Sequence, residues 1–467
     1  MFQELAQNLV SSLRNIRGKY ILLGLIFFYL VQLFAPNKPV YFFSYFLATG
    51  FFFLDNRDIR KSLFYSFILS LFSEVGLAGS LFLMEPSKLL LGSGWWISPM
   101  TLYIFLFFLF SFGKRIQKII LTDYLIFLFF LWNVVVFLVL PDRNSFFGFI
   151  SLMEQTIAYY LLRVNLSRDT LPVIITVVVS VLIFQTLLSS VQVLLRSPVG
   201  LRSEAILVEN PYGLTTVEEE NLFRVSGTYG HPNLFATFLL ATIPFLLFSA
   251  KFSWWKIVAS IFTFLALFFT YSRGAWFFSI PLMVTFGVIL LRQFGHAIRL
   301  RIRFLLLFPV FVIICVFLVF PAFILRFRTI SDAFVEGGSF QVRELLIQEA
   351  IRIIGAYPLT GVGLNRSLQW YANDPVTDLF TIVPISGFYR IHNTPLEIAT
   401  ETGIVGFILF LFILAATTFN FFSLKQDIVK IAAFLGLFGF LGISFLNPFF
   451  HASVFRIFFL LIAILAL

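Results

Sequence analysis

Long apolar runs follow one another along almost the whole chain, separated by short polar segments. A helix that crosses a lipid bilayer needs about 20 consecutive residues of this kind. The pattern predicts about fourteen such helices, of which the two shortest could instead be re-entrant. They lie near residues 19–36, 39–54, 61–83, 99–113, 118–140, 145–163, 171–195, 232–250, 254–271, 274–292, 303–327, 396–422, 428–446 and 448–467, and the two short runs are 39–54 and 99–113.

The composition of the chain indicates the same class of protein. Of its 467 residues, 60% are hydrophobic and 12% are charged. Soluble domains are about half apolar and about a quarter charged. No internal repeat or soluble linker divides the chain, so we expect one all-α polytopic membrane domain over residues 1–467. The polar, basic start lacks a cleavage site, and Tyr20–Ala35 is therefore interpreted as a membrane helix.

The distribution of basic residues predicts how the chain crosses the membrane. With the N-terminus inside, every short inner loop carries Lys or Arg, as the positive-inside rule requires. Two long loops, at about 196–231 and about 326–392, then face outward. Both contain arginines and no lysine. This bias is either chance or a preference for planar guanidinium groups, which bind phosphate oxygens in pairs.

The most informative polar segment spans residues 390–403 and reads RIHNTPLEIATETG. Thr394, Pro395 and Glu397 have the spacing of an N-cap, a first-turn proline and a capping-box glutamate. The segment therefore predicts a membrane helix that begins at Pro395, close to the outer surface.

Two side chains of this segment are candidates for chemistry. His392 precedes the positive end of the helix and lies beside Arg390, where an anion would be favoured. We therefore expect His392 to be functional rather than an ordinary loop histidine. Glu401, one turn deeper than Glu397, is the better candidate for an inward functional carboxylate. Asn393 completes the group of potential substrate contacts.

A second polar segment has the period of a helix over residues 340–354. Arg343 falls in the middle of the apolar face, where a charge is costly unless it is paired. We expect Arg343 to point into a site and to contact an anion or a carboxylate. Arg352 falls on the polar face and is interpreted as solvated. The glycines that follow, Gly361 and Gly363, are interpreted as turn residues because no Gly-Lys-Ser/Thr ending is present.

Two further outer segments carry candidate residues. In RVSGTYGHPN, which covers residues 224–233, a histidine again precedes a proline that begins a helix. Arg224, His231 and Asn233 of this segment are candidate substrate contacts. Arg273 lies at the turn between two predicted membrane helices, where it either extends to the interface or serves the site.

Metal chemistry and other classes of site lack support in the sequence. The outer loops contain no Asp-x-Asp and no His/Cys cluster with ligand spacing. The acidic run Glu218–Glu220 is interpreted as a solvated loop. His296 and His451 are interpreted as structural, and the single cysteine, Cys315, as an apolar filler. We expect no metal, no other cofactor and no nucleic-acid partner.

Four motifs together resemble the O-antigen ligase and O-antigen polymerase superfamily over roughly residues 220–405. They are GTYGHPN at 227–233, SRGA at 272–275, Arg343 leading into PLTGVG at 358–363, and His392-Asn393 followed by Leu396, Glu397, Glu401 and Gly403. Each motif alone is weak, and the order of the four is more specific.

The resemblance implies a GT-C-like fold with about twelve transmembrane helices, so we expect 12–14, and a large periplasmic loop that contains short helices. It implies an enzyme of the bacterial inner membrane that transfers a polyprenyl-diphosphate-linked glycan to an acceptor on the periplasmic face, with inversion and without metal. By the same resemblance His392 corresponds to the general base, and Arg273 and Arg343 correspond to diphosphate-binding arginines.

Two alternatives remain open at the level of sequence. A ligase and a polymerase differ only in the acceptor, which is lipid A-core in one case and another lipid-linked glycan in the other. A transporter or flippase for polysaccharide or lipid-linked oligosaccharide is the competing class. It would show inverted repeats, helices broken at matching positions and midplane charges, and the sequence lacks that symmetry.

Overall fold

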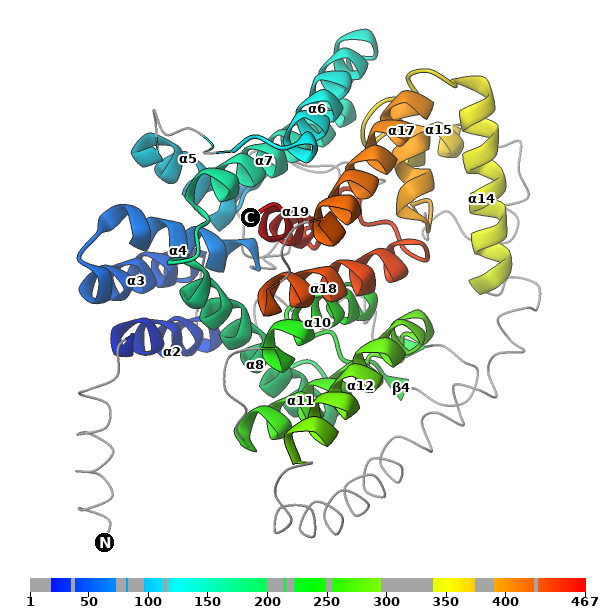
Figure 1. Cartoon of the computed structure of the whole chain (residues 1–467). Coiled ribbons are helices and arrows are strands. Elements are labelled where there is room, and N and C mark those ends of the chain that lie inside the picture. The colour runs from blue at the N-terminus through cyan, green and yellow to red at the C-terminus, as the bar shows by residue number, and fades with distance from the viewer. Residues whose placement is uncertain are drawn as a thin grey trace, which may run out of the picture.

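Figure 1 shows the computed structural model of the chain. It describes residues 18–34, 38–72, 81–82, 96–111, 116, 118–199, 214–215, 222–248, 254–294, 339–373, 390–423 and 427–467. The helices are α2 (Lys19–Phe34), α3 (Lys38–Asn56), α4 (Ile59–Leu71), α5 (Pro99–Ser111), α6 (Leu121–Val139), α7 (Arg143–Asn165), α8 (Leu171–Leu195), α10 (Pro232–Leu247), α11 (Trp254–Phe269), α12 (Arg273–Phe294), α14 (Ser339–Ala356), α15 (Ser367–Asn373), α17 (Thr394–Ser423), α18 (Ile428–Ser444) and α19 (Phe455–Leu465).

Strand structure in the described part of the chain is limited to two antiparallel pairs of two-residue strands. Strand β1 (Leu81–Phe82) pairs with β2 (Trp96–Ile97), and β3 (Leu214–Thr215) pairs with β4 (Leu222–Phe223). Three helices, α6, α8 and α17, are long and apolar enough to cross a membrane, and several shorter apolar helices accompany them. The prediction of an all-α polytopic membrane protein is confirmed.

Most of the predicted apolar runs coincide with helices where the structure describes them. The run at 61–83 was predicted too long, because its helix, α4, ends at Leu71 and Leu81–Phe82 form strand β1. The run at 303–327 lies outside the described residues. The last run, predicted at 448–467, was placed too early, because residues before Phe455 form turns and the helix is α19. Helices α14 and α15 lie in the long loop predicted to face outward. The side of the membrane and the total number of spans stay predictions.

Three helices are buried along most of their length. Almost all residues of α4, α10 and α19 are buried. Helix α10 packs against α8, α11, α12 and α18, and α19 packs against α7, α17 and α18. In Figure 1 α10, α18 and α19 lie in the middle of the molecule, α4 lies to one side with α3 and α5, and α14 stands at the edge near α17.

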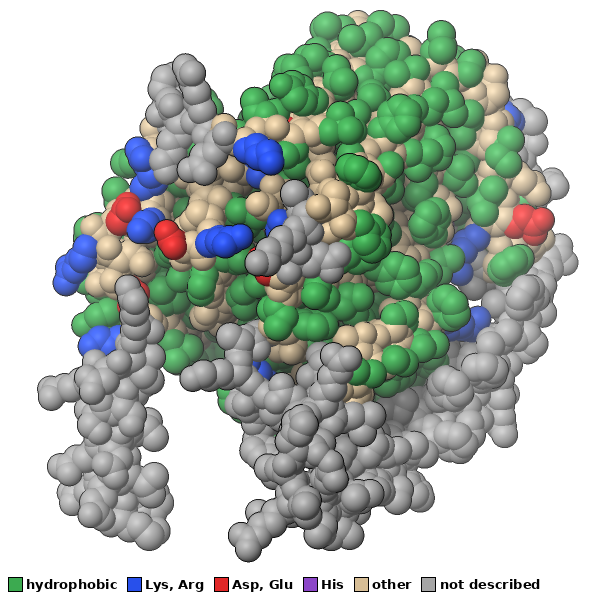
Figure 2. All heavy atoms as spheres, in the orientation of Figure 1, with side chains coloured by type: hydrophobic (Ala, Val, Ile, Leu, Met, Phe, Trp, Pro, Cys, Tyr) green, Lys and Arg blue, Asp and Glu red, His purple; other side chains and the backbone are tan. Residues whose placement is uncertain are grey.

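The outer surface of the helices is strongly apolar. Large hydrophobic side chains are exposed on several of them, including Phe34, Leu138, Leu194 and Phe419, the last of which is 70% exposed. Figure 2 shows that hydrophobic side chains cover much of one face, while charged ones gather mainly on one side of it. An apolar surface of this extent on a soluble protein would promote aggregation, whereas lipid covers it in a membrane protein.

A buried ion pair joins the end of α7 to the start of α6. Arg163 on α7 donates from Nε to Oδ1 of Asp123 on α6 at 2.8 Å and from Nη2 to Oδ2 at 3.0 Å. The same guanidinium donates to the carbonyl oxygens of Lys118 and Ala466, and the hydroxyl of Tyr159 donates to Asp123 at 2.6 Å. Both charges are thus fully hydrogen-bonded, as a buried pair requires.

Candidate functional site

Helix α17 begins with a side-chain cap, although not the one predicted. Oδ1 of Asn393 accepts the backbone N–H of Leu396 at 3.0 Å. Thr394, the predicted cap, instead donates its hydroxyl to the carbonyl of Asn447 at 2.7 Å and accepts the N–H of Phe449 at 2.8 Å. The prediction was wrong because the link between α18 and α19 provides partners for Thr394 that local spacing does not reveal.

The helical conformation of α17 is interrupted at Gly403, directly after the polar residues Thr400, Glu401 and Thr402. Gly403 has φ 70° and ψ −177°, which is not a helical conformation. The break leaves two carbonyl groups available to a neighbouring loop. The carbonyl of Thr400 accepts the N–H of Val362 at 2.9 Å, and that of Glu401 accepts the N–H of Gly363 at 3.2 Å. The PLTGVG motif therefore serves to pack against the ETG motif.

Glycine is required on both sides of this contact. Gly361 and Gly403 both have positive φ, 62° and 70°. A Cβ on Gly361 would lie 2.3 Å from the carbonyl oxygen of Thr400, and a Cβ on Gly403 would lie 1.9 Å from that of Leu359. The prediction that Gly361 is a turn residue is confirmed, and the close backbone approach adds a second reason for it.

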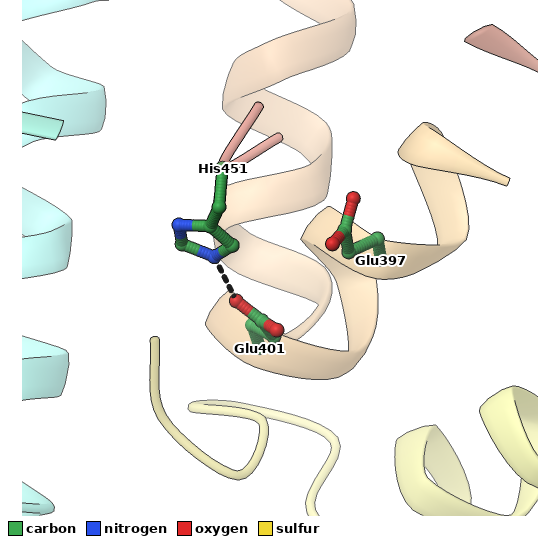
Figure 3. Close-up of side chains that lie close together, drawn as sticks. All are labelled: Glu397, Glu401 and His451. Carbon is green, nitrogen blue, oxygen red and sulfur yellow. Dashed lines mark hydrogen bonds and ion pairs between the residues drawn. The ribbon is translucent and has the colours of Figure 1, made fainter. Parts of the chain in front are cut away.

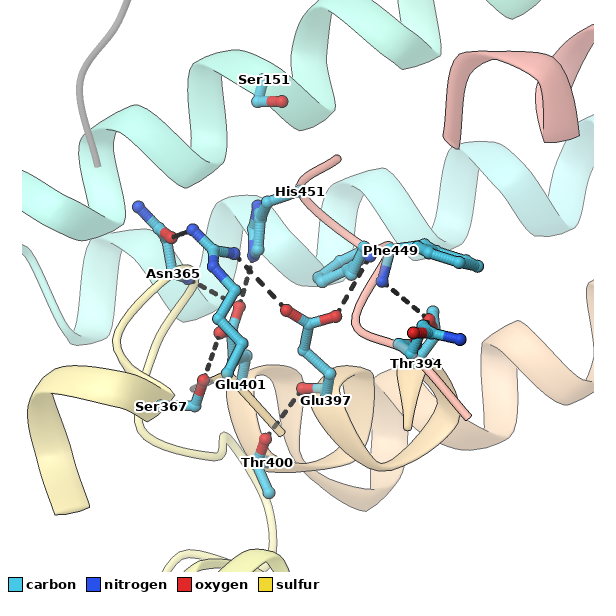
Figure 4. Close-up of polar contacts among 12 residues, drawn as sticks. Ser151, Asn365, Ser367, Thr394, Glu397, Thr400, Glu401, Phe449 and His451 are labelled. Carbon is cyan, nitrogen blue, oxygen red and sulfur yellow. Dashed lines mark hydrogen bonds and ion pairs between the residues drawn. The ribbon is translucent and has the colours of Figure 1, made fainter. Parts of the chain in front are cut away.

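Glu401 lies at the centre of the polar cluster that results (Figures 3 and 4). Its Oε2 accepts the N–H of Asn365 at 2.6 Å and hydrogen-bonds Nε2 of His451 at 2.5 Å. Its Oε1 accepts the hydroxyl of Ser367 at 2.7 Å. The glutamate is 1% exposed, so three partners satisfy a carboxylate that has no access to water.

Glu397 holds the second carboxylate of the cluster (Figure 4). Its Oε1 pairs with Nη1 of Arg390 at 3.4 Å, and its Oε2 accepts the N–H of Phe450 at 3.1 Å. The interpretation of Glu397 as a capping-box residue was therefore wrong, because its carboxylate turns toward the guanidinium. Arg390 also donates from Nη2 to Oδ1 of Asn365 at 2.6 Å.

The cluster brings together three side chains of the kind that bind metals. Ligand atoms of Glu397, Glu401 and His451 lie within 4.8 Å of one another. All three already have hydrogen-bond or ion-pair partners within the protein, so the cluster is satisfied as it stands. His451 was interpreted as structural, and the structure places it against Glu401, the carboxylate of α17 that was predicted to be functional.

His392 is held in one orientation by its own loop. Nδ1 of the ring lies 2.8 Å from the carbonyl oxygen of Arg390. A carbonyl only accepts, so Nδ1 carries the hydrogen and Nε2 of the neutral ring keeps its lone pair. Burial of the ring, together with the positive charge of Arg343, lowers the pKa of His392 to about 4. The neutral form therefore predominates at neutral pH.

His231 precedes α10 and has the opposite arrangement of hydrogens. Its Nδ1 accepts the backbone N–H of Asn233 at 3.1 Å and so caps the helix. The neutral ring then carries its hydrogen on Nε2 and can donate. Burial, the charge of Arg224 and the nearby His392 lower the pKa of His231 to about 3. The two histidines are thus a neutral donor and a neutral acceptor at the starts of two helices.

A row of amide groups links these two helix starts. Nη2 of Arg224 donates to Oδ1 of Asn233 at 3.2 Å, and Nδ2 of Asn233 donates to Oδ1 of Asn447 at 2.7 Å. Asn447 accepts the hydroxyl of Thr394 through its carbonyl. Nε of Arg224 donates to the carbonyl of Thr270, just before α12. The predicted substrate contacts Arg224 and Asn233 therefore also hold the starts of α10, α12 and α17 together.

Arg343 lies on the buried face of α14, as its sequence position predicted. The same face carries Leu346, Ala350 and Ile353, all of which are buried. Nε of Arg343 is buried and has no hydrogen-bond partner among the described residues. Burial and the nearby positive charge of Arg273 lower the pKa of Arg343. Two guanidinium groups thus lie close together, and an anion would relieve their repulsion.

The interpretation of Arg352 as a solvated residue was wrong. Its guanidinium pairs with the buried Glu349 at 2.8 Å and lies 4.2 Å from the centroid of the Trp370 ring. Glu349 precedes Arg352 on the helix by three residues, and the helical pattern alone did not place this glutamate in the interior. Arg352 is therefore a structural residue that fixes α14 against α15.

The structure thus gathers most of the predicted site at the starts of α10, α12 and α17 and along α14. His392 and Arg343 interact electrostatically, as do Arg343 and Arg273. Asn393 serves as the cap of α17 and donates to the carbonyl of Phe445 at 3.1 Å. Three other predictions, on Glu218–Glu220, His296 and Cys315, fall outside the described residues.

Comparison with known proteins supports the resemblance seen in the sequence. Residues 258–411 match the sequence model of a family described as O-antigen ligase. The match includes Arg273, Arg343, His392 and Glu401. No curated protein matches the chain.

Proposed function

We propose that this chain, which belongs to the O-antigen ligase superfamily through residues 258–411, transfers a glycan from a polyprenyl diphosphate to a hydroxyl group of an acceptor. The acceptor is either lipid A-core, in a ligase, or another lipid-linked glycan, in a polymerase. The proposed reaction takes place at the periplasmic face of the bacterial inner membrane. That side is the one assigned to the long loops by the distribution of basic residues.

In the proposed reaction the acceptor oxygen attacks the anomeric carbon of the donor sugar. A new C–O bond forms on one face while the bond to the diphosphate oxygen breaks on the other, so the configuration is inverted. His392 takes the hydroxyl proton on Nε2 and becomes an imidazolium. The diphosphate leaves with the bonding electron pair. Arg273 and Arg343 stabilise its negative charge.

The contact between Nδ1 of His392 and the carbonyl oxygen of Arg390 is the observation that carries this proposal. Nδ1–H of the ring donates to this backbone carbonyl, so the lone pair that a general base needs is on Nε2. The same residue lies within the electrostatic reach of Arg343, which lies on the buried face of an amphipathic helix. A neutral base next to a pair of fixed cations suits a reaction that releases a proton and a diphosphate together.

The proposal includes metal independence, because two arginines provide the positive charge that the leaving group needs. His231 is assigned to the substrate as a neutral donor from Nε2. Arg390 and Glu401 are assigned a supporting role, since both are engaged in the buried cluster next to His392.

A transfer assay with purified protein and a lipid-diphosphate glycan tests the assignment. We expect His392→Ala to lower the rate on the order of a hundredfold or more. Arg366→Ala removes a half-exposed arginine whose nearest carboxylate is 3.8 Å away, and it should remain active. All variants would be assayed in EDTA. Near-normal transfer by His392→Ala would exclude the assigned base, and a loss in EDTA that magnesium restores would exclude the metal-free reaction.

One observation favours a second function, transport of a lipid-linked glycan. Helix α17 is broken at Gly403, and broken helices occur at the binding sites of transporters. Reconstituted vesicles that contain a fluorescent lipid-diphosphate glycan separate the two functions. Transfer without movement between leaflets supports the enzyme, and movement without transfer supports the transporter.

A further inference from the structure

The link between α18 and α19 carries a histidine that the proposed reaction leaves without a role. Nε2 of His451 lies 2.5 Å from Oε2 of Glu401, and the two side chains are 8% and 1% exposed. An imidazole and a carboxylate are costly to bury, and they become rigid once they are fully hydrogen-bonded. An apolar pair would pack in the same place at a lower cost in desolvation.

A continuous series of contacts leads from this histidine to the proposed base, and Figure 4 shows the part of it around Glu401 and Asn365. Glu401 also accepts the N–H of Asn365 at 2.6 Å. Oδ1 of Asn365 accepts Nη2 of Arg390 at 2.6 Å. The carbonyl of Arg390 then accepts the hydrogen from Nδ1 of His392 at 2.8 Å. These bonds join three segments that are distant in sequence, around residue 365, over residues 390–401 and around residue 451.

From these contacts we infer that His451 is a positioning residue for the transfer reaction, acting through Glu401, Asn365 and Arg390 to fix the ring of His392. The inference rests on the proposed function, since it assumes that His392 is the base. His451 touches neither the substrate nor the reacting atoms in this scheme. Its contribution is to keep Nε2 of His392 aimed at the acceptor hydroxyl.

Asn365 links Glu401 to Arg390, so a displacement of Glu401 can reach Arg390 through it. Its backbone has φ 57°, a left-handed conformation that asparagine tolerates better than most residues. Its N–H is held by Glu401, and its side chain holds Arg390. A shift of the Glu401 carboxylate therefore displaces the backbone of Asn365, and with it the side-chain oxygen that binds Arg390. The other anchor of Arg390, on Glu397, is longer at 3.4 Å and less able to compensate.

Glu397, Glu401 and His451 could in principle bind a metal, and this reading competes with the positioning role. Their ligand atoms lie within 4.8 Å of one another. A metal would have to displace the N–H groups of Asn365 and Phe450 and the hydroxyl of Ser367 from the carboxylates. The observed hydrogen bonds therefore favour positioning, and the experiment includes the metal as an outcome.

The test compares His451→Phe with His451→Gln, which keeps an N–H donor of similar reach. The full-length protein would be purified in detergent, and kcat, the KM for the acceptor and the thermal midpoint would be measured. We expect His451→Phe to lower kcat about tenfold to a hundredfold, as small misplacements of a reacting group do, with little change in KM. His451→Gln should recover most of the lost rate. Ser453→Ala, a change in the same link, is the control and should behave as wild type.

A second variant, Ser367→Ala, tests the inference in case His451→Phe does not fold. Ser367→Ala removes one hydrogen bond from Glu401 and leaves the packing intact, and it should lower kcat by a few-fold, about the effect of one modest hydrogen bond. Equal kcat for wild type and His451→Phe at normal yield, or equal losses in the Phe and Gln variants, would overturn the inference. Activity lost in EDTA and restored by zinc would replace it with a metal site.

Failure of this inference can be distinguished from failure of the proposed function. If His392→Ala is inactive while His451→Phe is fully active, only the positioning role is wrong. If His392→Ala remains active, the base itself is wrongly assigned, and the inference falls with it.

Discussion

Two arginines in different parts of the molecule, Arg163 buried and Arg343 partly buried, show how differently the same side chain can be used. Arg163 faces Asp123 and makes four hydrogen bonds, two to the carboxylate and two to backbone carbonyls. Arg343 lies on the buried face of α14 with its Nε unpaired among the described residues, and its described charged neighbour is another arginine. The two arginines therefore differ in the partners that surround their guanidinium groups.

The comparison shows that the partners of a buried charge indicate whether it serves the fold or a ligand. A buried charge that is fully paired contributes to one folded arrangement, and removal of either partner leaves the other uncompensated. A buried charge without a partner destabilises the free protein and is retained where a ligand of opposite charge completes it. Arg163 belongs to the first kind, and we assign Arg343 to the second.

The largest expected effect is on stability at the structural pair. Arg163→Met should destabilise the protein by about 3–5 kcal/mol, because Asp123 then stays buried without its partner. Arg343→Met should leave the thermal midpoint unchanged or raise it, since it removes a charge without a described partner. Thermal unfolding in detergent measures both. A lower midpoint for Arg343→Met than for Arg163→Met would break the comparison.

Activity should be lowered more by Arg343→Met than by Arg163→Met, which is the reverse of the order for stability. The pH dependence of the activity also distinguishes the two variants. The pKa of His392 is lowered to about 4, first by burial and then by Arg343, so the base stays neutral and active down to about pH 5. In Arg343→Met the positive charge is gone, so the pKa of His392 rises. As the pH is lowered, the activity of this variant should therefore begin to fall at a higher pH than that of wild type.

The pH–rate profiles of Arg343→Met and Arg163→Met would be compared with wild type at a temperature where all three are folded. Only Arg343→Met should shift the acidic limb of the kcat/KM profile to higher pH. This variant should also have a lower maximal rate. An unchanged limb in Arg343→Met, or the same shift in both variants, would show that Arg343 does not act on His392.

The smallest effect is expected at Arg352, which is intermediate between the two cases. Its guanidinium pairs with the buried Glu349 and stacks on Trp370, yet its side chain is 29% exposed. We expect Arg352→Ala to cost about 1–3 kcal/mol of stability, because Glu349 loses an ion pair. The transfer rate per folded molecule should stay close to wild type. A loss of rate as large as that of Arg343→Met at normal stability would place Arg352 in the site as well.

Most of the helical architecture could be predicted from the sequence. Apolar runs set the positions of the membrane helices, since hydrocarbon favours any segment long enough to cross it. The amphipathic period of α14 placed Arg343 on the buried face correctly. The motifs around His392 and Arg273 also pointed to the family whose model matches residues 258–411.

Side-chain partners could not be predicted in the same way. Spacing favours Thr394 as a cap and Glu397 as its capping-box partner, and both instead bind the link between α18 and α19. At the break in α17, the loop that contains Gly361 lies too close to Gly403 for either glycine to carry a side chain. His451 lies fifty residues from the carboxylate it contacts.

The sequence by itself thus determined the membrane class, the helix positions and the residue types available for chemistry. These properties follow from local periodicity and from the cost of placing polar groups in lipid. Only the tertiary structure decided which carboxylate meets which cation, which nitrogen of His392 keeps its lone pair and where α17 breaks. A hydrogen bond depends on distances of a few tenths of an ångström between segments far apart in the chain, and no local pattern encodes those distances.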